Sequence, residues 1–228
     1  MNSNLPVSVL IAAYNAEKYV AETINSVLQQ TQQPTEIIVI DDGSTDDTKS
    51  ILETFRDKIR IISRENRGVP RSVNQAIQLS TQPLICFLDA DDLWHPDKLK
   101  TQYQAYTAAP DIVLLFGHIK QFISPELSAN AKSKIYYPEK NEQGWVRGSM
   151  MCHRSLFKDI GKFDESLKHG DFIDWFGKVK QSGIPYKMLD EVVIYRRLHP
   201  NGLSNILNHR SDFVTILKKR LDKARKNQ

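Results

Sequence analysis

Residues 84–99, LICFLDADDLWHPDKL, place an apolar run of strand length directly before three carboxylates, Asp89, Asp91 and Asp92. Side chains two positions apart on extended backbone point the same way, so Asp89 and Asp91 can converge on one point. Two like charges held that close repel each other unless a cation lies between them. The stretch therefore predicts a strand that ends in a site for Mg²⁺ or Mn²⁺, which take oxygen ligands.

An acidic cluster at a strand end can also be a solvated turn, because Asp favours turns for its own reasons. The apolar strand in front of the cluster, and Trp94 and Pro96 behind it, favour a binding site instead. Ligands of open α/β sheets bind at the ends of strands, which agrees with that interpretation.

Apolar runs of strand length alternate with helical spacing through the first hundred residues. Strands are expected at 7–13, 36–40, 60–63 and 84–88. Short connections between alternating strands and helices predict a doubly wound, mostly parallel α/β sheet. The loops that such a sheet brings to one edge are 14–17, 41–46, 66–71 and 89–92. Beyond residue 100 the pattern indicates a smaller, mixed β/α region, in which a strand is expected at 145–152.

A glycine-rich phosphate cradle is missing after the first strand, where the sequence reads AAYN at 12–15. This excludes the dinucleotide fingerprint of dehydrogenases and the phosphate loop of P-loop enzymes. It also argues against a sugar-phosphate nucleotidyltransferase, which should carry a Gly-rich loop there. A phosphatase with an aspartyl nucleophile would place its Asp-x-Asp after the first strand, whereas here it follows the fourth. A bound diphosphate must then rest on a metal.

Composition is that of an ordinary globular protein, with 40% hydrophobic and 25% charged residues in 228. The net charge of +4 is concentrated in a basic segment at 218–226, which argues against a general nucleic-acid-binding face. The polar N-terminus does not resemble a signal peptide, and no apolar run is long enough to span a bilayer. Cys86 and Cys152 are expected to be buried free thiols. A cytoplasmic location is expected.

Six segments follow one another along the chain: VSVLIAAYNAEKY (7–19), IIVIDDGSTDDT (37–48), NRGV (66–69) with Asn74, LDADDLWHP (88–96), IGKFDESL (160–167) and YRRLHPNGLS (195–204). Together, and in this order, they resemble glycosyltransferase family 2. The resemblance implies a GT-A fold and inverting transfer of a hexosyl or N-acetylhexosaminyl group. It also implies a nucleotide diphosphate donor, most often a UDP-sugar, with Mn²⁺ or Mg²⁺ on the diphosphate.

Residue by residue, the resemblance assigns the donor side. Tyr14, Asn15 and Glu17 would line the nucleoside, and Asp42 would accept a hydrogen bond from a uracil-type imide. Asp89 would lie near the ribose and the metal. The nucleotide-sugar set is Ala13, Tyr14, Asn15, Glu17, Asp42, Arg71, Asp89 and Ala90, where Arg71 has a solvated helix face as its alternative. The metal set is Asp91, Asp89 and His199, where His199 has a structural role as its alternative.

Inverting transfer needs a general base on the acceptor hydroxyl. In this family the base is an Asp just before a helix, but Phe172 occupies that place when the motif is aligned on Asp174 and Trp175. Asp171 is the first candidate and Asp174 the second, and whichever is not the base is expected to cap the helix.

The acceptor side is assigned to Trp145, Trp175 and Arg147, and the acceptor is expected to be a glycan or a lipid-linked sugar. One domain is expected over 1–228, with a nucleotide-sugar half at about 5–110, an acceptor half at about 111–205 and a basic helical tail at 206–228. The tail is either a solvated helix end or a contact with an anionic inner-membrane surface. Because of Phe172, a non-catalytic nucleotide-sugar-binding protein of the same fold is the alternative.

Overall fold

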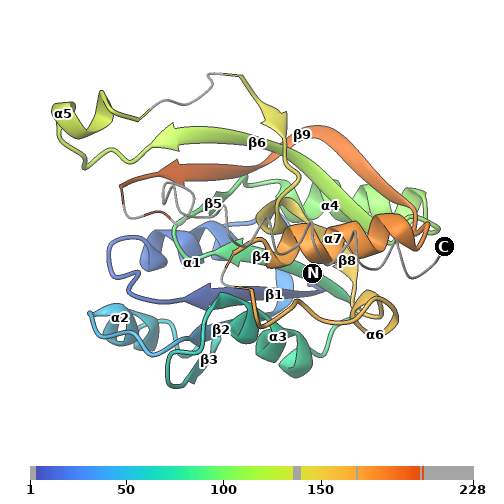
Figure 1. The fold of residues 1–228 in the computed structure, drawn as a ribbon, viewed down its shortest axis with the longest axis horizontal. Helices are drawn as coiled ribbons and strands as arrows, with labels where there is room; N and C mark the ends of the chain where they lie inside the picture. The colour runs from blue at the N-terminus through green and yellow to red at the C-terminus, as the bar shows by residue number, and fades with distance from the viewer. Residues whose placement is uncertain (1–3, 136–139, 168, 201, 203–228) are drawn as a thin grey trace.

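The computed structural model describes residues 4–135, 140–167, 169–200 and 202 (Figure 1). In these residues a nine-stranded sheet has the order β3-β2-β1-β4-β8-β6-β9-β5, with β7 paired to β6. Its parallel half consists of β1 (Leu5–Ala13), β2 (Pro34–Asp41), β3 (Arg60–Ser63) and β4 (Leu84–Asp89). The helices that connect these strands are α1 (Val20–Leu28), α2 (Thr48–Glu53) and α3 (Val69–Leu79).

The mixed half of the sheet follows β4. Its strands are β5 (Leu93–Trp94), β6 (Leu114–Ile123), β7 (Glu142–Gln143), β8 (Met151–His153) and β9 (Tyr186–Leu198). Its helices are α4 (Lys98–Ala108), α5 (Ala129–Lys132), the 3₁₀ turn η1 (Arg147–Ser149), α6 (Leu156–Asp159) and α7 (Asp171–Gln181). β6 and β9 run parallel as the two long, curved strands at the top of Figure 1, while β8 is antiparallel to both β4 and β6.

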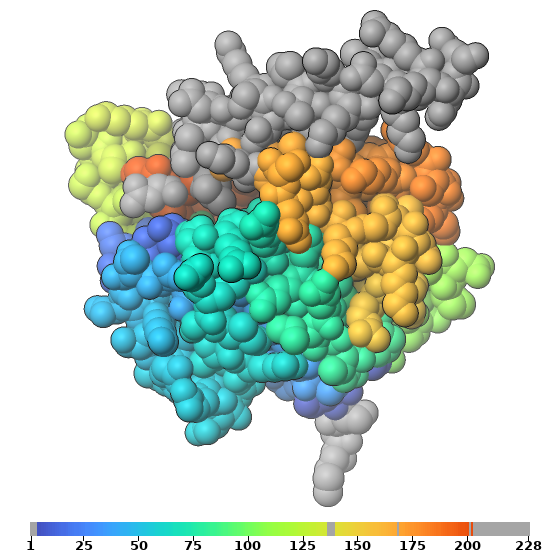
Figure 2. Space-filling model, turned by 60° about the horizontal axis from the view of Figure 1, so that its bottom comes forward, coloured from blue at the N-terminus to red at the C-terminus, as the bar shows by residue number. Residues whose placement is uncertain are grey.

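Two apolar clusters fill the two faces of the sheet, because successive side chains of a strand point to opposite faces. On one face Val7, Val9 and Ile11 of β1 pack under α1, α2 and α4. On the other face Leu10 of the same strand packs under α3, α6 and α7. Figure 2 shows the surface over this second face, where the segment before α7 adjoins α3. Helices on both faces confirm the doubly wound α/β class predicted from the alternation.

The register brings the carboxyl ends of three strands level with one another. Ala13 of β1 pairs with Asp41 of β2, and Ala12 pairs with Asp89 of β4. The predicted edge of polar loops is therefore present. The strand expected at 145–152 is wrong before Met151, because residues 147–149 form the turn η1 and only β8 is a strand. Gly148 lets this turn pack closely against β9, since a Cβ there would lie 2.7 Å from Ile194 Cδ1.

Among the described residues, no helix combines the length and the apolar character needed to cross a membrane. The predicted basic tail at 206–228 lies outside the described residues.

Candidate active site

The loops after β1 and β2 are joined by hydrogen bonds in both directions. Thr45 N donates to Asn15 Oδ1 at 2.8 Å, Asp47 N donates to Glu17 Oε2 at 3.1 Å, and Glu17 N donates to Asp46 Oδ2 at 3.1 Å. Asn15 holds a left-handed backbone with φ 47°, which Asn tolerates better than most residues. We call residues 14–17 with 44–48 the loop pair. Two of the residues predicted to line a nucleoside thus also fasten one loop to the other.

The first residue of the loop pair has a large aromatic side chain that is open to solvent. Tyr14 is 49% exposed, whereas Ala13 behind it and Ala90 on the neighbouring loop are buried. Asp42 N donates to Ala13 O at 2.8 Å, which continues the sheet by one residue. These predicted donor-side residues therefore lie at the same edge of the sheet, with Tyr14 available to a ligand.

Asp42 is 3% exposed and anchors the loop between β3 and α3. Arg64 Nε donates to Asp42 Oδ1 at 2.8 Å, Arg67 N donates to the same oxygen at 3.1 Å, and Gly68 N donates to Oδ2 at 2.8 Å. Both carboxylate oxygens are already used by the protein. Arg64 was not among the residues predicted from the sequence, although its position directly after a strand at this edge was a signal for it.

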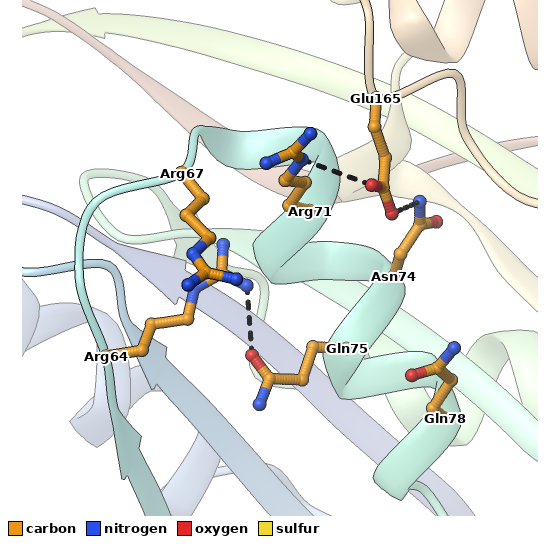
Figure 3. Close-up of a pocket in the computed structure, with 7 residues that line it drawn as sticks. All are labelled: Arg64, Arg67, Arg71, Asn74, Gln75, Gln78 and Glu165. Atoms are coloured by element: carbon orange, nitrogen blue, oxygen red, sulfur yellow. Dashed lines mark hydrogen bonds and ion pairs between the residues drawn. The ribbon is translucent and has the colours of Figure 1, made fainter.

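Beside Asp42 a cavity of about 440 Å³ opens along α3 (Figure 3). Arg71, a predicted donor-side residue, lines it and pairs with Glu165 through Nε at 3.2 Å. Asn74 Nδ2 donates to Glu165 at 3.0 Å and to Phe163 O at 2.9 Å, which holds the far wall against α3. The full lining is Arg64, Arg67, Arg71, Asn74, Gln75, Gln78 and Glu165.

A chain of two ion pairs joins the acidic strand end to α7. Arg147 Nη2 lies 3.1 Å from Asp89 Oδ1, and Arg147 Nη1 lies 2.8 Å from Asp171 Oδ2. The Arg147 side chain is largely buried. Burial alone would lower the pKa of Arg147, but the charges of Asp171 and Asp89 raise it. Arg147 is therefore held as a cation between a predicted metal-side carboxylate and the first candidate base.

The second candidate base faces elsewhere. Asp174 is buried on α7 and pairs with Lys178 of the same helix at 2.7 Å. Of the two candidates, only Asp171 is linked to Asp89 through Arg147 in the described residues. Phe172, which occupies the usual place of the base, packs edge-on against Phe116 and stacks with Phe176 in the core.

Asp91 and His199 lie together, 108 positions apart in the sequence. His199 Nε2 and Asp91 Oδ2 are 3.0 Å apart, and the His199 ring lies 4.7 Å from the Tyr19 ring. The described residues contain no group of three or more His, Cys, Asp or Glu side chains placed to hold a metal. The Asp91 carboxylate nonetheless suits Mg²⁺ or Mn²⁺, which keep several positions for water and phosphate oxygens. Asp89, the third predicted ligand, has Arg147 as its partner.

Arg197 is a second residue that the sequence analysis missed. Its Nε donates to Asp91 O at 2.8 Å, and its guanidinium lies 4.7 Å from the ring centroids of both Tyr19 and Phe122. Its backbone N donates to Asp92 Oδ1 at 2.8 Å. Burial, with added repulsion from Asp91 and Asp89, raises the pKa of Asp92 well above its usual range. The Asp92 carboxylate thus has a structural role, because it binds the backbone of β9. The pair of arginines at 196 and 197 was the signal for Arg197 in the sequence.

The two tryptophans assigned to the acceptor side differ. Trp145 is 37% exposed and stacks on Phe176 with ring centroids 5.5 Å apart. Trp175 is fully buried, stacks on Phe157 at 4.9 Å and donates from Nε1 to Gly161 O at 2.9 Å. Its ring has no open face, so the acceptor contact predicted for Trp175 is wrong. Position 175 lies on the side of helix α7 that faces the sheet.

Comparisons with known proteins agree with this architecture. The family model described as glycosyl transferase family 2 matches residues 8–160. An uncharacterized glycosyltransferase of Rickettsia typhi is 30% identical over 238 residues, covering 97% of this chain and 73% of the relative. The crystal structure of Staphylococcus aureus TarS 1–349 in complex with UDP has a TM-score of 0.68 at 22% identity, over 93% of this chain and 63% of that one. The mannosyltransferase PcManGT from Pyrobaculum calidifontis, in complex with GDP-Man and Mn²⁺, has a TM-score of 0.68 at 20% identity. The match covers 96% of this chain and 65% of that one.

Proposed function

The chain belongs to glycosyl transferase family 2 with a GT-A fold, and we propose that it transfers a sugar from a nucleotide diphosphate donor to an acceptor hydroxyl with inversion. We take the donor to be a UDP-sugar carrying a hexosyl or N-acetylhexosaminyl group. The acceptor is then a glycan or a lipid-linked sugar. The observation that carries this proposal is the Asp89–Arg147–Asp171 chain.

Asp171 is our proposed general base. Its Oδ2 accepts from Arg147, while its Oδ1 accepts no hydrogen bond from any described residue. That oxygen can take the proton from an acceptor hydroxyl as the hydroxyl attacks the anomeric carbon. Arg147 fixes the carboxylate against the strand end where the donor diphosphate would lie, which favours an aligned attack. Asp174 would serve α7 through Lys178 only.

The donor would lie along the edge formed by β1, β2 and β4. We place the nucleoside against Tyr14 and the loop pair, and the diphosphate and sugar near Asp89, Ala90 and Arg71. The TarS structure of similar fold, which is in complex with UDP, supports a uridine nucleotide as part of the donor. Asp42 contributes either directly or by holding Arg64 and the loop before α3 in place.

Asp91 and His199 would hold the metal ion, with Asp89 beside them. When bound, Mn²⁺ or Mg²⁺ would neutralise the charge that develops on the leaving diphosphate. The PcManGT complex, which contains Mn²⁺ with GDP-Man, supports the use of a metal ion together with a sugar nucleotide on this fold.

The acceptor side would be formed by Arg147 and the exposed face of Trp145. The nucleotide-sugar half would then be residues 5–110 and the acceptor half residues 111–205 of one domain. Free, buried Cys86 and Cys152 suit the reducing cytoplasm, where sugar nucleotides would meet the enzyme. We propose membrane contact only for the basic tail, which lies outside the described residues.

The test combines binding with turnover. Thermal shifts with UDP and GDP, each with and without Mn²⁺, are followed by nucleotide release from UDP-glucose, UDP-GlcNAc and GDP-mannose. We expect UDP with Mn²⁺ to raise the melting temperature and at least one donor to be hydrolysed or transferred. Asp171→Asn should lower turnover by about 10³-fold or more with UDP affinity kept, whereas Asp174→Asn should change turnover less than tenfold. An Asp171→Asn variant with full turnover would refute the assignment of the base.

One observation favours a second function. Phe172 stands in the core where the family motif puts its base, so a binding protein that has lost catalysis remains an alternative. Tight binding of UDP with Mn²⁺, without release of nucleotide from any of the three donors, would identify that function.

A further inference from the structure

Lys98 is a buried cation without a counter-ion. It begins α4, its side chain is fully buried, and it forms no ion pair with any carboxylate in the described part of the chain. Nζ instead donates to Gln102 Oε1 at 2.7 Å and to Ser149 O at 3.2 Å, and it lies 5.0 Å from the centroid of the Trp94 ring. Burial of an ammonium group without an opposite charge is unfavourable, so the position calls for a reason.

Gln102 makes the same contact from the next turn of α4. It is fully buried, and its Nε2 donates to Ser149 O at 2.7 Å. One carbonyl oxygen therefore accepts from two buried side chains, and Lys98 and Gln102 are also bonded to each other. We call Lys98 and Gln102 the α4 clamp.

The α4 clamp grips the turn that carries Arg147. Ser149 is the last residue of η1, and its Oγ donates back to Gly144 O and Val146 O. Gly148 packs closely against β9, where an added Cβ would lie 2.7 Å from Ile194 Cδ1. The turn is thus held on one side by α4 and β9, while Arg147 leaves from its other side toward Asp89 and Asp171.

We propose that Lys98 and Gln102 are positioning residues for Arg147, acting through the Ser149 carbonyl oxygen. The inference rests on the proposed function for its catalytic meaning, but its geometric claim stands without it. A neutral lysine amine still has two N–H donors, so the clamp keeps its hydrogen bonds after deprotonation. The groups that face Nζ are Cys86, Trp94, Gln102 and Ser149, and none of them carries a negative charge at neutral pH.

An activity-free test uses the side-chain N–H signals of arginine in ¹H–¹⁵N NMR spectra. Arg147 should give a sharp Nε–H signal, assigned by its loss in Arg147→Lys, because its guanidinium is buried and paired. In Lys98→Met and in Gln102→Leu this signal should shift or broaden, while it should stay unchanged in Lys100→Met, a matched change on the exposed face of α4. An unchanged Arg147 signal in both clamp variants would overturn the proposal, and Gln102→Leu alone decides if Lys98→Met does not fold.

A kinetic test applies once a donor is turned over. Lys98→Met should lower kcat about tenfold, with the Kd for UDP and Mn²⁺ within about twofold of wild type. In an Arg147→Ala background the same change should have no further effect, because residues that act through one another are not additive. Effects that multiply in the double variant would overturn the proposal. Absence of turnover in every variant would count against the proposed function, leaving the NMR result to decide this one.

Discussion

The loop pair and the Asp89–Arg147–Asp171 chain meet at the same sheet edge but are stabilised in different ways. Apart from the buried hydrogen bond between Ala16 N and Thr48 Oγ1, the contacts between the two loops of the loop pair are exposed, and their side chains satisfy backbone N–H groups that water could also satisfy. In the ion-pair chain Arg147 and Asp171 are largely buried while the Asp89 side chain is half exposed, and the buried Arg147 charge depends on both carboxylates. Removing a partner should therefore cost little in the first region and much in the second, because a buried charge without a partner is unfavourable.

The largest effect should come from the packing beneath the ion-pair chain. Trp175→Ala should lower the free energy of unfolding by about 3–5 kcal/mol, since it removes a fully buried aromatic side chain that supports α7. Trp145→Ala, at a 37% exposed ring, should lower it by about 1 kcal/mol or less and act on the KM for the acceptor. Urea denaturation of both variants checks the pair. Similar losses of unfolding free energy in the two variants would contradict the expected difference between the buried and the exposed tryptophan.

The next largest effect should be a pH dependence of the free energy of unfolding that comes from Lys98, which holds the turn carrying Arg147. Burial lowers the pKa of Lys98 from its ordinary 10.5 to about 8. Below pH 8 both the folded and the unfolded chain hold the proton, but between about 8 and 10.5 only the unfolded chain does. Stability should therefore rise with pH across that window, by about 3 kcal/mol in total. The rise is measured as the difference between wild type and Lys98→Met in urea denaturation.

The difference isolates Lys98 because other titrating groups are present in both proteins. Burial raises the pKa of Cys86 to about 11, and the neighbouring Lys98 charge acts in the opposite direction, so without Lys98 this pKa should be higher still. Folded Cys86 therefore largely keeps its proton up to about pH 10.5 in both proteins, and the stability that it costs above about pH 9 cancels in the difference. A difference that stays flat from pH 8 to 10.5 would mean that Lys98 is not buried in solution.

The smallest effect should come from the loop pair. Asn15→Ala removes the acceptor for Thr45 N and places Ala at a positive φ, so the free energy of unfolding should fall by about 1–2 kcal/mol. Asn15→Gly restores the backbone freedom and should recover part of that loss. Thermal melts of the two variants measure the effect. A loss as large as that of Trp175→Ala would remove the contrast between the regions.

Periodicity was enough to predict the first half of the fold. The strands 7–13, 36–40, 60–63 and 84–88 are present because each is a short apolar run followed by a turn, and their order requires a common edge. The strand expected at 145–152 failed because Gly148 packs against β9 there, which is a contact between distant segments. Local pattern contains no information on such contacts.

The candidate site was predictable in its residues but not in its pairings. Asp89, Asp91, Asp171 and His199 were all named from motifs, yet the choice between Asp171 and Asp174 depends on how α7 is rotated against the sheet. That rotation is set by Phe172 and Trp175 in the core, and the same rotation removed Trp175 from the surface. Arg64 and Arg197 were missed because a basic residue in the sequence does not reveal which carboxylate it will meet.

The placement of β9 between β6 and β5 has a consequence for biosynthesis. Within the described ranges, β5 pairs with β9 alone, which lies about a hundred residues later in the chain. His199 follows β9 directly, so synthesis must proceed past residue 199 before Asp91 can meet its imidazole neighbour. A nascent chain that has finished its parallel half would thus be compact but would still lack the Asp91–His199 pair, which forms only when β9 joins the sheet.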